Sequence, residues 1–212
     1  MVFNLEPITI AQVKYLCTKY HGYGSASNTA TYAFGVLENG VLVAAYAWQP
    51  PPVGAAKSVC PEAPQGVLAL SRMVAVPKDQ RQLKHVSKPL ILQMKKLIDR
   101  TRWPVLVTYS DEGQGHTGYV YKCSGWKPTK ISKNPYFLNA EGKRVSSYSN
   151  GVTGCRAISF GGYTTIQRWE NWACPEGTAL EYMSKNGWQR VAIPGKVWMS
   201  GNQAYRYEKI EA

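Results

Sequence analysis

Hydrophobic positions in the first quarter of the chain follow first a helical and then an alternating pattern. Over residues 9–20, apolar side chains recur at intervals of three and four residues, which is typical of an amphipathic helix, and Thr9 is suited to be its N-cap. Residues 32–37 and 41–48 then alternate, and the Asn39-Gly40 pair between the two runs favours a tight turn. The pattern therefore predicts a helix followed by a β-hairpin.

The middle of the chain is predicted to alternate between strands and helices. A proline-rich stretch, residues 50–64, predicts a mobile surface loop, and the long apolar run at 67–76 predicts a central strand. Residues 90–102 carry a helical stripe, 104–109 form a short apolar run, and 116–124 have the pattern of a further helix. This order predicts an α/β fold built on a mixed sheet.

The pattern changes beyond about residue 130, where short strands and glycine-rich turns follow one another. One helical stretch, residues 178–186, interrupts them. We therefore expect a core over residues 1–130 and a C-terminal β-rich elaboration over residues 131–212, packed on the same sheet. A separate second domain is the alternative.

The net charge of the chain indicates which kinds of partner it can bind. Lys and Arg number 25 against 13 Asp and Glu, which gives a net charge of +12, and a surface of this kind attracts polyanions such as double-stranded DNA. A basic enzyme without a nucleic-acid role is the alternative. In the C-terminal part, basic residues are interleaved with aromatic ones, a combination suited to holding a phosphate backbone and stacking a base. The candidate DNA-contacting residues are Lys127, Lys130, Lys133, Lys143 and Arg144.

Several classes of protein are not supported. No apolar run is long enough to cross a bilayer, and the first residues lack the pattern of a secretory signal, so we expect a cytoplasmic protein without membrane contact. The cysteines are odd in number and scattered, with no C-x-x-C pair, which argues against a disulfide framework or a zinc cage. The sequence does not predict the oligomeric state.

Three polar side chains lie where such a fold would place chemistry. Asp111 follows the apolar run 104–109, and open α/β sheets bind ligands at the ends of such strands. His21 follows the first helix in a loop of small residues, where it could act as a base or a metal ligand. Arg72, in the central strand, could neutralise a charged ligand. Each has an ordinary structural alternative: Asp111 could cap a loop, His21 could be a surface imidazole, and Arg72 could form a salt bridge.

A strand that ends in Val74-Ala75-Val76-Pro77 leads into a basic loop and a helix, and a later helix carries Tyr121 ahead of Gly125-Trp126. Both motifs resemble those of the GCN5-related N-acetyltransferases. The resemblance implies a mixed-sheet N-acetyltransferase-like fold and an acetyl-CoA-type acyl donor, whose pyrophosphate would lie on loop N–H groups. It also implies that Tyr121 protonates the departing thiolate. The cofactor-binding positions that it implies are Val74, Val76, Arg81, Lys84 and Ser87.

The same loop departs from the acetyltransferase pattern. The glycines of that family are missing, and Lys84 and either Val86 or Ser87 stand in their place. Because glycine lets the backbone approach phosphate groups closely, we predict weakened coenzyme A binding. An ordinary strand-to-helix connection is the alternative.

A wider set of positions indicates a resemblance to a more specific family. His21, Leu70-Ser71-Arg72, Ser110-Asp111 and residues 115–121 are together similar to the Mom family of phage DNA-modification proteins. This resemblance implies transfer of an acetamido-type group to the N6 amine of adenine in duplex DNA, which protects phage DNA from restriction. It also implies an iron ion, for which His21 and Asp111 would be ligands. The functional residues that it implies are His21, Arg72, Asp111 and Tyr121.

Two other functions fit the sequence. One is an acyl-CoA-dependent N-acetyltransferase acting on a protein or a small-molecule amine, and the other is a DNA-binding protein without catalytic activity. The basic and aromatic C-terminal part favours DNA modification over the first, and the set of His21, Asp111 and Tyr121 favours it over the second. We further predict that His21 and Asp111 line one pocket, although they are far apart in the sequence.

Overall fold

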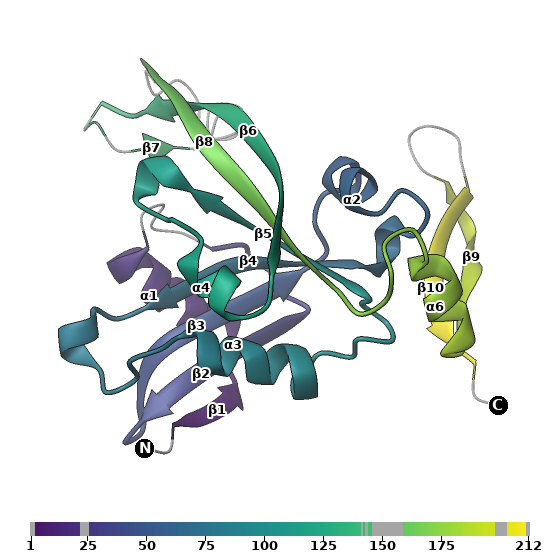
Figure 1. Cartoon of the computed structure of the whole chain (residues 1–212), viewed down its shortest axis with the longest axis horizontal. Coiled ribbons are helices and arrows are strands. Elements are labelled where there is room, and N and C mark those ends of the chain that lie inside the picture. The colour runs from purple at the N-terminus through teal and green to yellow at the C-terminus, as the bar shows by residue number, and fades with distance from the viewer. Residues whose placement is uncertain are drawn as a thin grey trace.

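The computed structural model describes residues 3–21, 26–140, 142, 144–145, 159–197 and 203–210. A twisted sheet of eight strands forms the body, and a sheet of two strands lies beside it with the C-terminal helix (Figure 1). The strands are β1 (Asn4–Pro7), β2 (Tyr32–Glu38), β3 (Val41–Gln49), β4 (Val67–Ala75), β5 (Val105–Asp111), β6 (Lys127–Leu138), β7 (Arg144–Val145), β8 (Ser159–Trp172), β9 (Trp188–Val197) and β10 (Gln203–Lys209). The helices are α1 (Ile10–Tyr20), α2 (Val53–Val59), α3 (Ser87–Leu92), which continues as a π-helical turn over Gln93–Leu97, α4 (Tyr119–Cys123) and α6 (Ala179–Lys185).

The order of strands in the large sheet is β1-β2-β3-β4-β5-β8-β6-β7. All neighbours are antiparallel except β4 and β5, which are parallel. These two strands pair only between Val67–Ala69 and Val105–Val107, so beyond Ala69 and Val107 they part. The sheet is thus mixed, as predicted, and it opens at its centre.

The first helix and the hairpin confirm the predictions made from the hydrophobic pattern. Thr9 caps α1 through a capping box with Gln12, which satisfies N–H groups at the helix start. Asn39 and Gly40 both have positive φ, 51° and 79°, as a two-residue turn between β2 and β3 requires. The turn holds Glu38 at the end of β2.

Two local predictions were wrong. The proline-rich stretch predicted as a loop contains α2, because Pro52 begins a helix whose Ala56 and Val59 are buried in a second core cluster. The helix predicted over residues 116–124 is only α4, because Gly118 before it has φ +72°. A Cβ atom at Gly118 would meet the ring of Trp169 at 2.1 Å, so this close approach excludes a side chain there.

The C-terminal part is β-rich, as predicted, and β8 lies inside the large sheet between β5 and β6. The strands β6 and β8 form a long antiparallel ladder that extends beyond the body of the molecule (Figure 1). Strands β9 and β10 form the separate small sheet. In the part of the chain that the structure describes, no helix has the length and apolar character needed to span a membrane.

Candidate functional site

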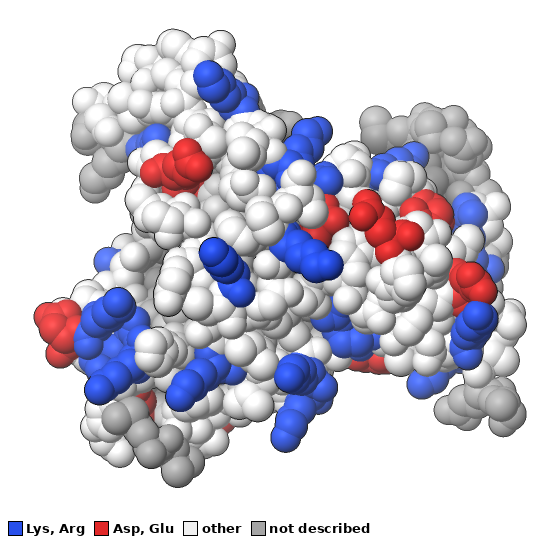
Figure 2. Space-filling view, in the orientation of Figure 1, with Lys and Arg blue, Asp and Glu red and all other residues white. Residues whose placement is uncertain are grey.

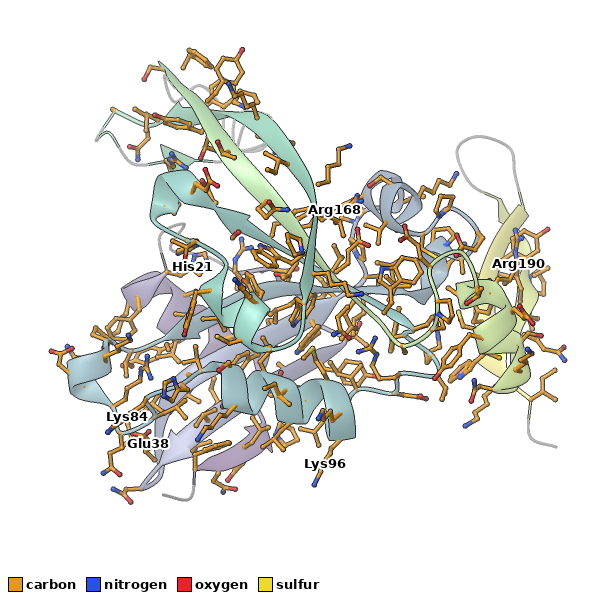
Figure 3. The ribbon with its side chains drawn as sticks, viewed as in Figure 1. His21, Glu38, Lys84, Lys96, Arg168 and Arg190 are labelled. Atoms are coloured by element: carbon orange, nitrogen blue, oxygen red, sulfur yellow. The ribbon has the colours of Figure 1, made fainter. Side chains whose placement is uncertain are left out.

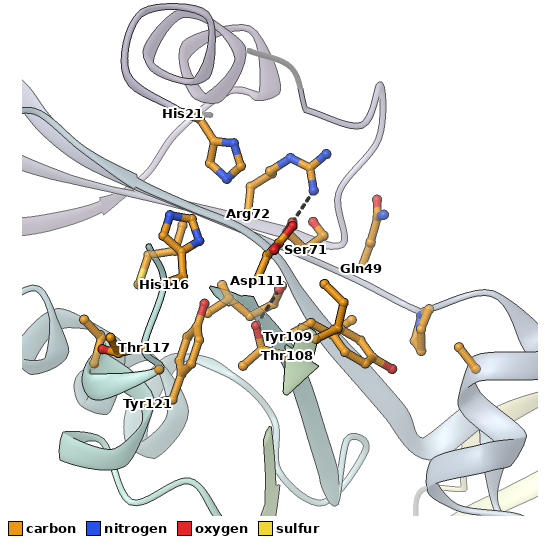
Figure 4. A pocket seen from close by; sticks show the side chains of 18 of the residues that line it. His21, Gln49, Ser71, Arg72, Thr108, Tyr109, Asp111, His116, Thr117 and Tyr121 are labelled. Atoms are coloured by element: carbon orange, nitrogen blue, oxygen red, sulfur yellow. Dashed lines mark hydrogen bonds between the residues drawn. The ribbon is translucent and has the colours of Figure 1, made fainter. Parts of the chain in front are cut away.

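A cavity of about 590 Å³ lies where β4 and β5 part (Figure 4). Residues 70–73 of β4 and residues of β5 form two of its walls, and residues 115–121, which lead into α4, form a third. The pairing of β3 with β4 shifts between Ala47 and Trp48, which leaves Ser71 as an extra residue at the opening. The sheet itself therefore creates the site, and short segments from elsewhere in the chain complete it.

His21 enters this cavity from the C-terminal end of α1, where its backbone N–H donates to the carbonyl of Cys17. Its ring meets that of His116 nearly edge-on, with 6.4 Å between centroids. Burial, together with the positive charge of Arg72 and the neighbouring His116, lowers the pKa of His21 to about 4. At neutral pH the imidazole is therefore uncharged and able to accept a proton.

Arg72 lies beside His21 in the cavity (Figure 4). Its Nη1 donates to the carbonyl oxygen of Ser71 at 2.7 Å, so the residue at the bulge of β4 orients the guanidinium. The Oγ of Ser71 in turn donates to the carbonyl of Ala47 on β3. Arg72 thus provides a positioned positive charge at the opening between the strands.

Asp111, at the end of β5, lines the same cavity, and its carboxylate has several partners. Arg144 of β7 forms an ion pair with it at 2.9 Å, the N–H of Gly113 donates at 3.0 Å, and the hydroxyl of Thr164 donates as well. The side chains of Arg144 and Asp111 are only 13% and 8% exposed. Asp111 is therefore an anchor between β5, β7 and β8.

Tyr121 of α4 forms part of the cavity wall, with its ring near those of Trp126 and Trp169 at 5.9 and 6.0 Å between centroids. Burial raises the pKa of its phenol, and this effect outweighs the hydrogen bond with Thr108. The hydroxyl consequently stays protonated at neutral pH and can donate.

The four residues predicted as functional, His21, Arg72, Asp111 and Tyr121, all line one cavity. His21 and Asp111 in particular share it, as expected. His116, the first residue of the helix predicted over residues 116–124, also lines the cavity. No pattern in the sequence predicted the ion pair between Asp111 and Arg144.

The predicted DNA-contacting residues are divided by the structure. Lys127, Lys130 and Lys133 are exposed on β6. Arg144 lies instead in the ion pair with Asp111, with its guanidinium 3.9 Å from the ring centroid of Tyr136. Lys143 lies outside the described residues.

The iron expectation finds no support in this site. Across the described residues, no three His, Cys, Asp or Glu side chains stand close enough together to hold a metal ion. The carboxylate of Asp111, expected as a ligand, is occupied by the guanidinium of Arg144. A cation beside a metal ion would oppose its binding.

The loop expected to bind the pyrophosphate of a donor joins β4 to α3. Val74 and Val76 are buried in the core, Lys84 is exposed, and Ser87 is the first residue of α3. The N–H groups of Gln82 and Leu83 bind an anionic group, the carboxylate of Glu38. The chemistry of this loop thus fits an acidic ligand, although a side chain of the protein itself is the ligand here.

Comparison with known proteins places both the fold and the family. yncA from Salmonella typhimurium, assigned as an acetyltransferase and solved with its cofactor acetyl-CoA, matches with a TM-score of 0.51 and 9% identity, over 83% of this chain and 96% of that one. A protein assigned as an acetyltransferase from Staphylococcus epidermidis matches with a TM-score of 0.51 and 13% identity, over 82% of this chain and 100% of that one. The fold is therefore the N-acetyltransferase fold. A search among curated proteins finds no match.

The family is identified by sequence. The Mom protein family matches residues 2–167, a range that includes every residue of the candidate site. Since this range is most of the chain, the protein belongs to the Mom family.

Proposed function

We propose that this protein transfers an acyl-derived, acetamido-type group to the N6 amine of adenine in duplex DNA and thereby protects phage DNA from restriction. The observation that carries the proposal is the meeting of His21, Arg72 and Tyr121 in one cavity at the opening of β4 and β5. A cavity of about 590 Å³ lies within the range of about 300–1,000 Å³ typical of small-molecule sites. Membership of the Mom family supports the choice of adenine as the acceptor.

The residues of the cavity supply complementary chemistry. The N6 amine of adenine is a poor nucleophile, because its lone pair is delocalised into the ring, and it must lose a proton as the new bond forms. His21 lies in the cavity and is uncharged at neutral pH, so it can accept that proton, although its lowered pKa makes it a weaker base than an ordinary imidazole. Arg72 is placed to stabilise the negative charge that develops on the carbonyl oxygen of the donor, and protonated Tyr121 is placed to give its proton to the leaving group.

The donor is part of the proposal. yncA binds acetyl-CoA, and we extend an acetyl-CoA-type donor to this chain. Bound acetyl-CoA would supply an activated carbonyl carbon as a thioester, and the coenzyme A thiol would be the leaving group. Backbone N–H groups and Arg81 of the loop between β4 and α3 would hold its diphosphate.

The long ladder of β6 and β8 offers a surface for the duplex. Lys127, Lys130 and Lys133 are exposed along β6. The register of the ladder puts Lys133 on the same face as Phe160 and Tyr163 of β8, whose rings are 58% and 67% exposed, and puts Lys127 and Lys130 on the opposite face. On the face shown in Figure 2, basic side chains are spread over the molecule, and acidic ones lie toward the C-terminal α6 and also at the upper and lower left. Because lysines bind phosphates and exposed rings can stack on a displaced base, this surface favours DNA over a protein or a small-molecule amine.

Mass spectrometry of nucleosides tests the function directly. DNA from cells that express the protein should contain a modified adenosine, heavier than adenosine by the transferred group. Cells that express the His21→Ala variant at the same level should lack it. If the wild type yields no new adenosine while it acylates protein or small-molecule amines, the alternative acetyltransferase function is correct.

Charge reversal on β6 should weaken duplex binding. We expect the triple variant Lys127→Glu, Lys130→Glu, Lys133→Glu to bind DNA more weakly at every salt concentration. The slope of log affinity against log salt should fall by about 0.9 for each phosphate contact that is lost. Fluorescence anisotropy with a labelled duplex measures both quantities.

The triple reversal of Lys88, Lys95 and Lys96 is the matched control. These lysines are exposed on α3 and the turn that continues it, so their reversal changes the net charge equally at another place. An equal loss of affinity in both variants would mean that net charge, and not the β6 surface, governs binding.

Removing the hydroxyl of Tyr121 should slow the reaction. Tyr121→Phe keeps the ring against Trp126 and Trp169 and loses only the proton donor, so we expect a rate loss of about 10² to 10⁴ with unchanged folding. Tyr119→Phe is the control, because Tyr119 is 68% exposed on the same helix. A normal rate for Tyr121→Phe would assign the ring to packing alone.

A further inference from the structure

A carboxylate of the protein occupies the loop that should receive the donor. The backbone N–H of Gln82 donates to Oε2 of Glu38 at 2.7 Å, and the N–H of Leu83 donates to Oε1. Both oxygens of the carboxylate are therefore engaged by two consecutive amides, which is how a backbone loop binds an anion. Glu38 comes from β2, more than forty residues earlier in the chain.

The hairpin places Glu38 firmly. It is the last residue of β2, pairs with Val41 of β3 and precedes the tight Asn39-Gly40 turn. Because β2 is held between β1 and β3, the backbone at this position is fixed. The carboxylate can leave the loop by rotation of its own side chain, without rearrangement of the sheet.

The loop has a further donor that the carboxylate does not use. Arg81 donates from Nε to the carbonyl of Val76 at 2.8 Å, while its Nη1 is buried with no hydrogen-bond partner among the residues that the structure describes. A buried charged donor that is left without an acceptor is energetically unfavourable. A diphosphate has more acceptor oxygens than a carboxylate and could engage Arg81 together with the two amides.

The loop is separate from the cavity between β4 and β5. Among the described residues that line the cavity, none comes from residues 74–107. Figure 3 shows the same separation: Glu38 and Lys84 lie at the far end of the β2–β3 hairpin, away from His21. A change at Glu38 therefore leaves His21, Arg72 and Tyr121 in place.

We propose that Glu38 is an internal competitor of the donor: its carboxylate fills the anion site formed by the Gln82 and Leu83 amides, and the diphosphate of a coenzyme A-type donor must displace it. The inference rests on the donor named in the proposed function. Only the fraction of molecules with Glu38 displaced binds the donor, so the measured affinity is reduced by that fraction. Glu38 thereby sets the donor concentration at which the enzyme is filled.

Isothermal titration with coenzyme A tests this competition on the full chain. If Glu38 fills the site nine-tenths of the time, Glu38→Ala should bind coenzyme A about tenfold more tightly than the wild type. Glu38→Gln, which keeps one carbonyl acceptor but no charge, should show a smaller gain. Inorganic pyrophosphate should compete with coenzyme A in Glu38→Ala at lower concentration than in the wild type.

Asp79→Asn is the matched control, because Asp79 is an exposed acid of the same loop for which no contact with these amides is found among the described residues. Its affinity for coenzyme A should equal that of the wild type. An equal gain in Asp79→Asn, an unchanged or weaker affinity in Glu38→Ala, or no binding by either protein overturns the proposal. If Glu38→Ala does not fold, the same titration is made with Glu38→Gln. A higher coenzyme A affinity than that of the wild type then supports the proposal, and an unchanged or weaker affinity overturns it.

The binding test is independent of DNA modification. If coenzyme A affinity rises in Glu38→Ala but no modified adenosine forms in the wild type, the competition stands and the proposed acceptor is wrong. If modified adenosine forms and the affinities are equal, only the role of Glu38 is wrong.

Discussion

Replacing Asp111 with alanine is expected to destabilise the fold by about 3–5 kcal/mol, since it removes one partner of a buried ion pair. The side chains of Asp111 and Arg144 are only 8% and 13% exposed, and the same carboxylate also accepts from Gly113 and Thr164. Alanine removes the acceptor of the guanidinium, of the Thr164 hydroxyl and of the Gly113 N–H, of which the last still donates to Oγ1 of Thr164 at 3.2 Å. The free energy of unfolding from urea denaturation measures the loss.

Two further variants give this prediction its control. Adding Arg144→Met to Asp111→Ala should restore part of the stability, because no buried charge is then left without a partner. Glu181→Ala breaks an exposed ion pair with Lys185 and should change stability little, because ion pairs between exposed side chains contribute little. If Asp111→Ala costs no more than Glu181→Ala, the network around Asp111 does not support the fold.

Replacing His21 with alanine should lower the rate of adenine modification by about 10² to 10⁴, the usual contribution of a general base. His85→Ala is the control, because His85 is exposed in the loop between β4 and α3. Quantitative nucleoside mass spectrometry measures both rates. A rate for His21→Ala equal to that of His85→Ala would remove His21 from the mechanism.

The pH dependence has a definite sign. The pKa of His21 in the folded protein is lowered to about 4 from 6.5, so the imidazole stays a base down to about that pH, and the rate due to His21 should fall only as the pH approaches 4. Between 6.5 and 4 the unfolded chain binds the proton and the folded one does not, so the contribution of His21 to stability falls as the pH falls through this window. A rate that already halves near pH 6.5 would contradict the lowered pKa.

Local patterns predicted the elements whose structure depends on neighbours in sequence. The helix capped by Thr9 and the Asn39-Gly40 hairpin were predicted and are confirmed, because capping and turn chemistry act within a few residues. The helix α2 was missed, since its Ala56 and Val59 are buried by a core cluster assembled from distant segments. Burial of these side chains in the folded protein therefore stabilises a helix where the prolines predicted a loop.

The sequence predicted which residues line the cavity but not which other residues they contact. His21, Arg72, Asp111 and Tyr121 were identified from sequence, largely through family resemblance, and they line one cavity. Two contacts join residues that are far apart in the chain: Arg144 pairs with Asp111, and Glu38 accepts from the amides of the loop between β4 and α3. Such partners depend on strand register, and a single sequence without its fold does not reveal register.

Arg144 contacts both the cavity between β4 and β5 and strand β6. Its guanidinium pairs with Asp111 at the cavity and stacks on Tyr136 of β6, the strand that carries the exposed lysines. A phosphate that drew Arg144 away would free the carboxylate of Asp111, so the occupancy of the cavity and of the β6 surface would be thermodynamically linked. Such linkage is reciprocal: by whatever factor a duplex on β6 changed the affinity of the cavity for its ligand, that ligand would change the affinity for the duplex by the same factor.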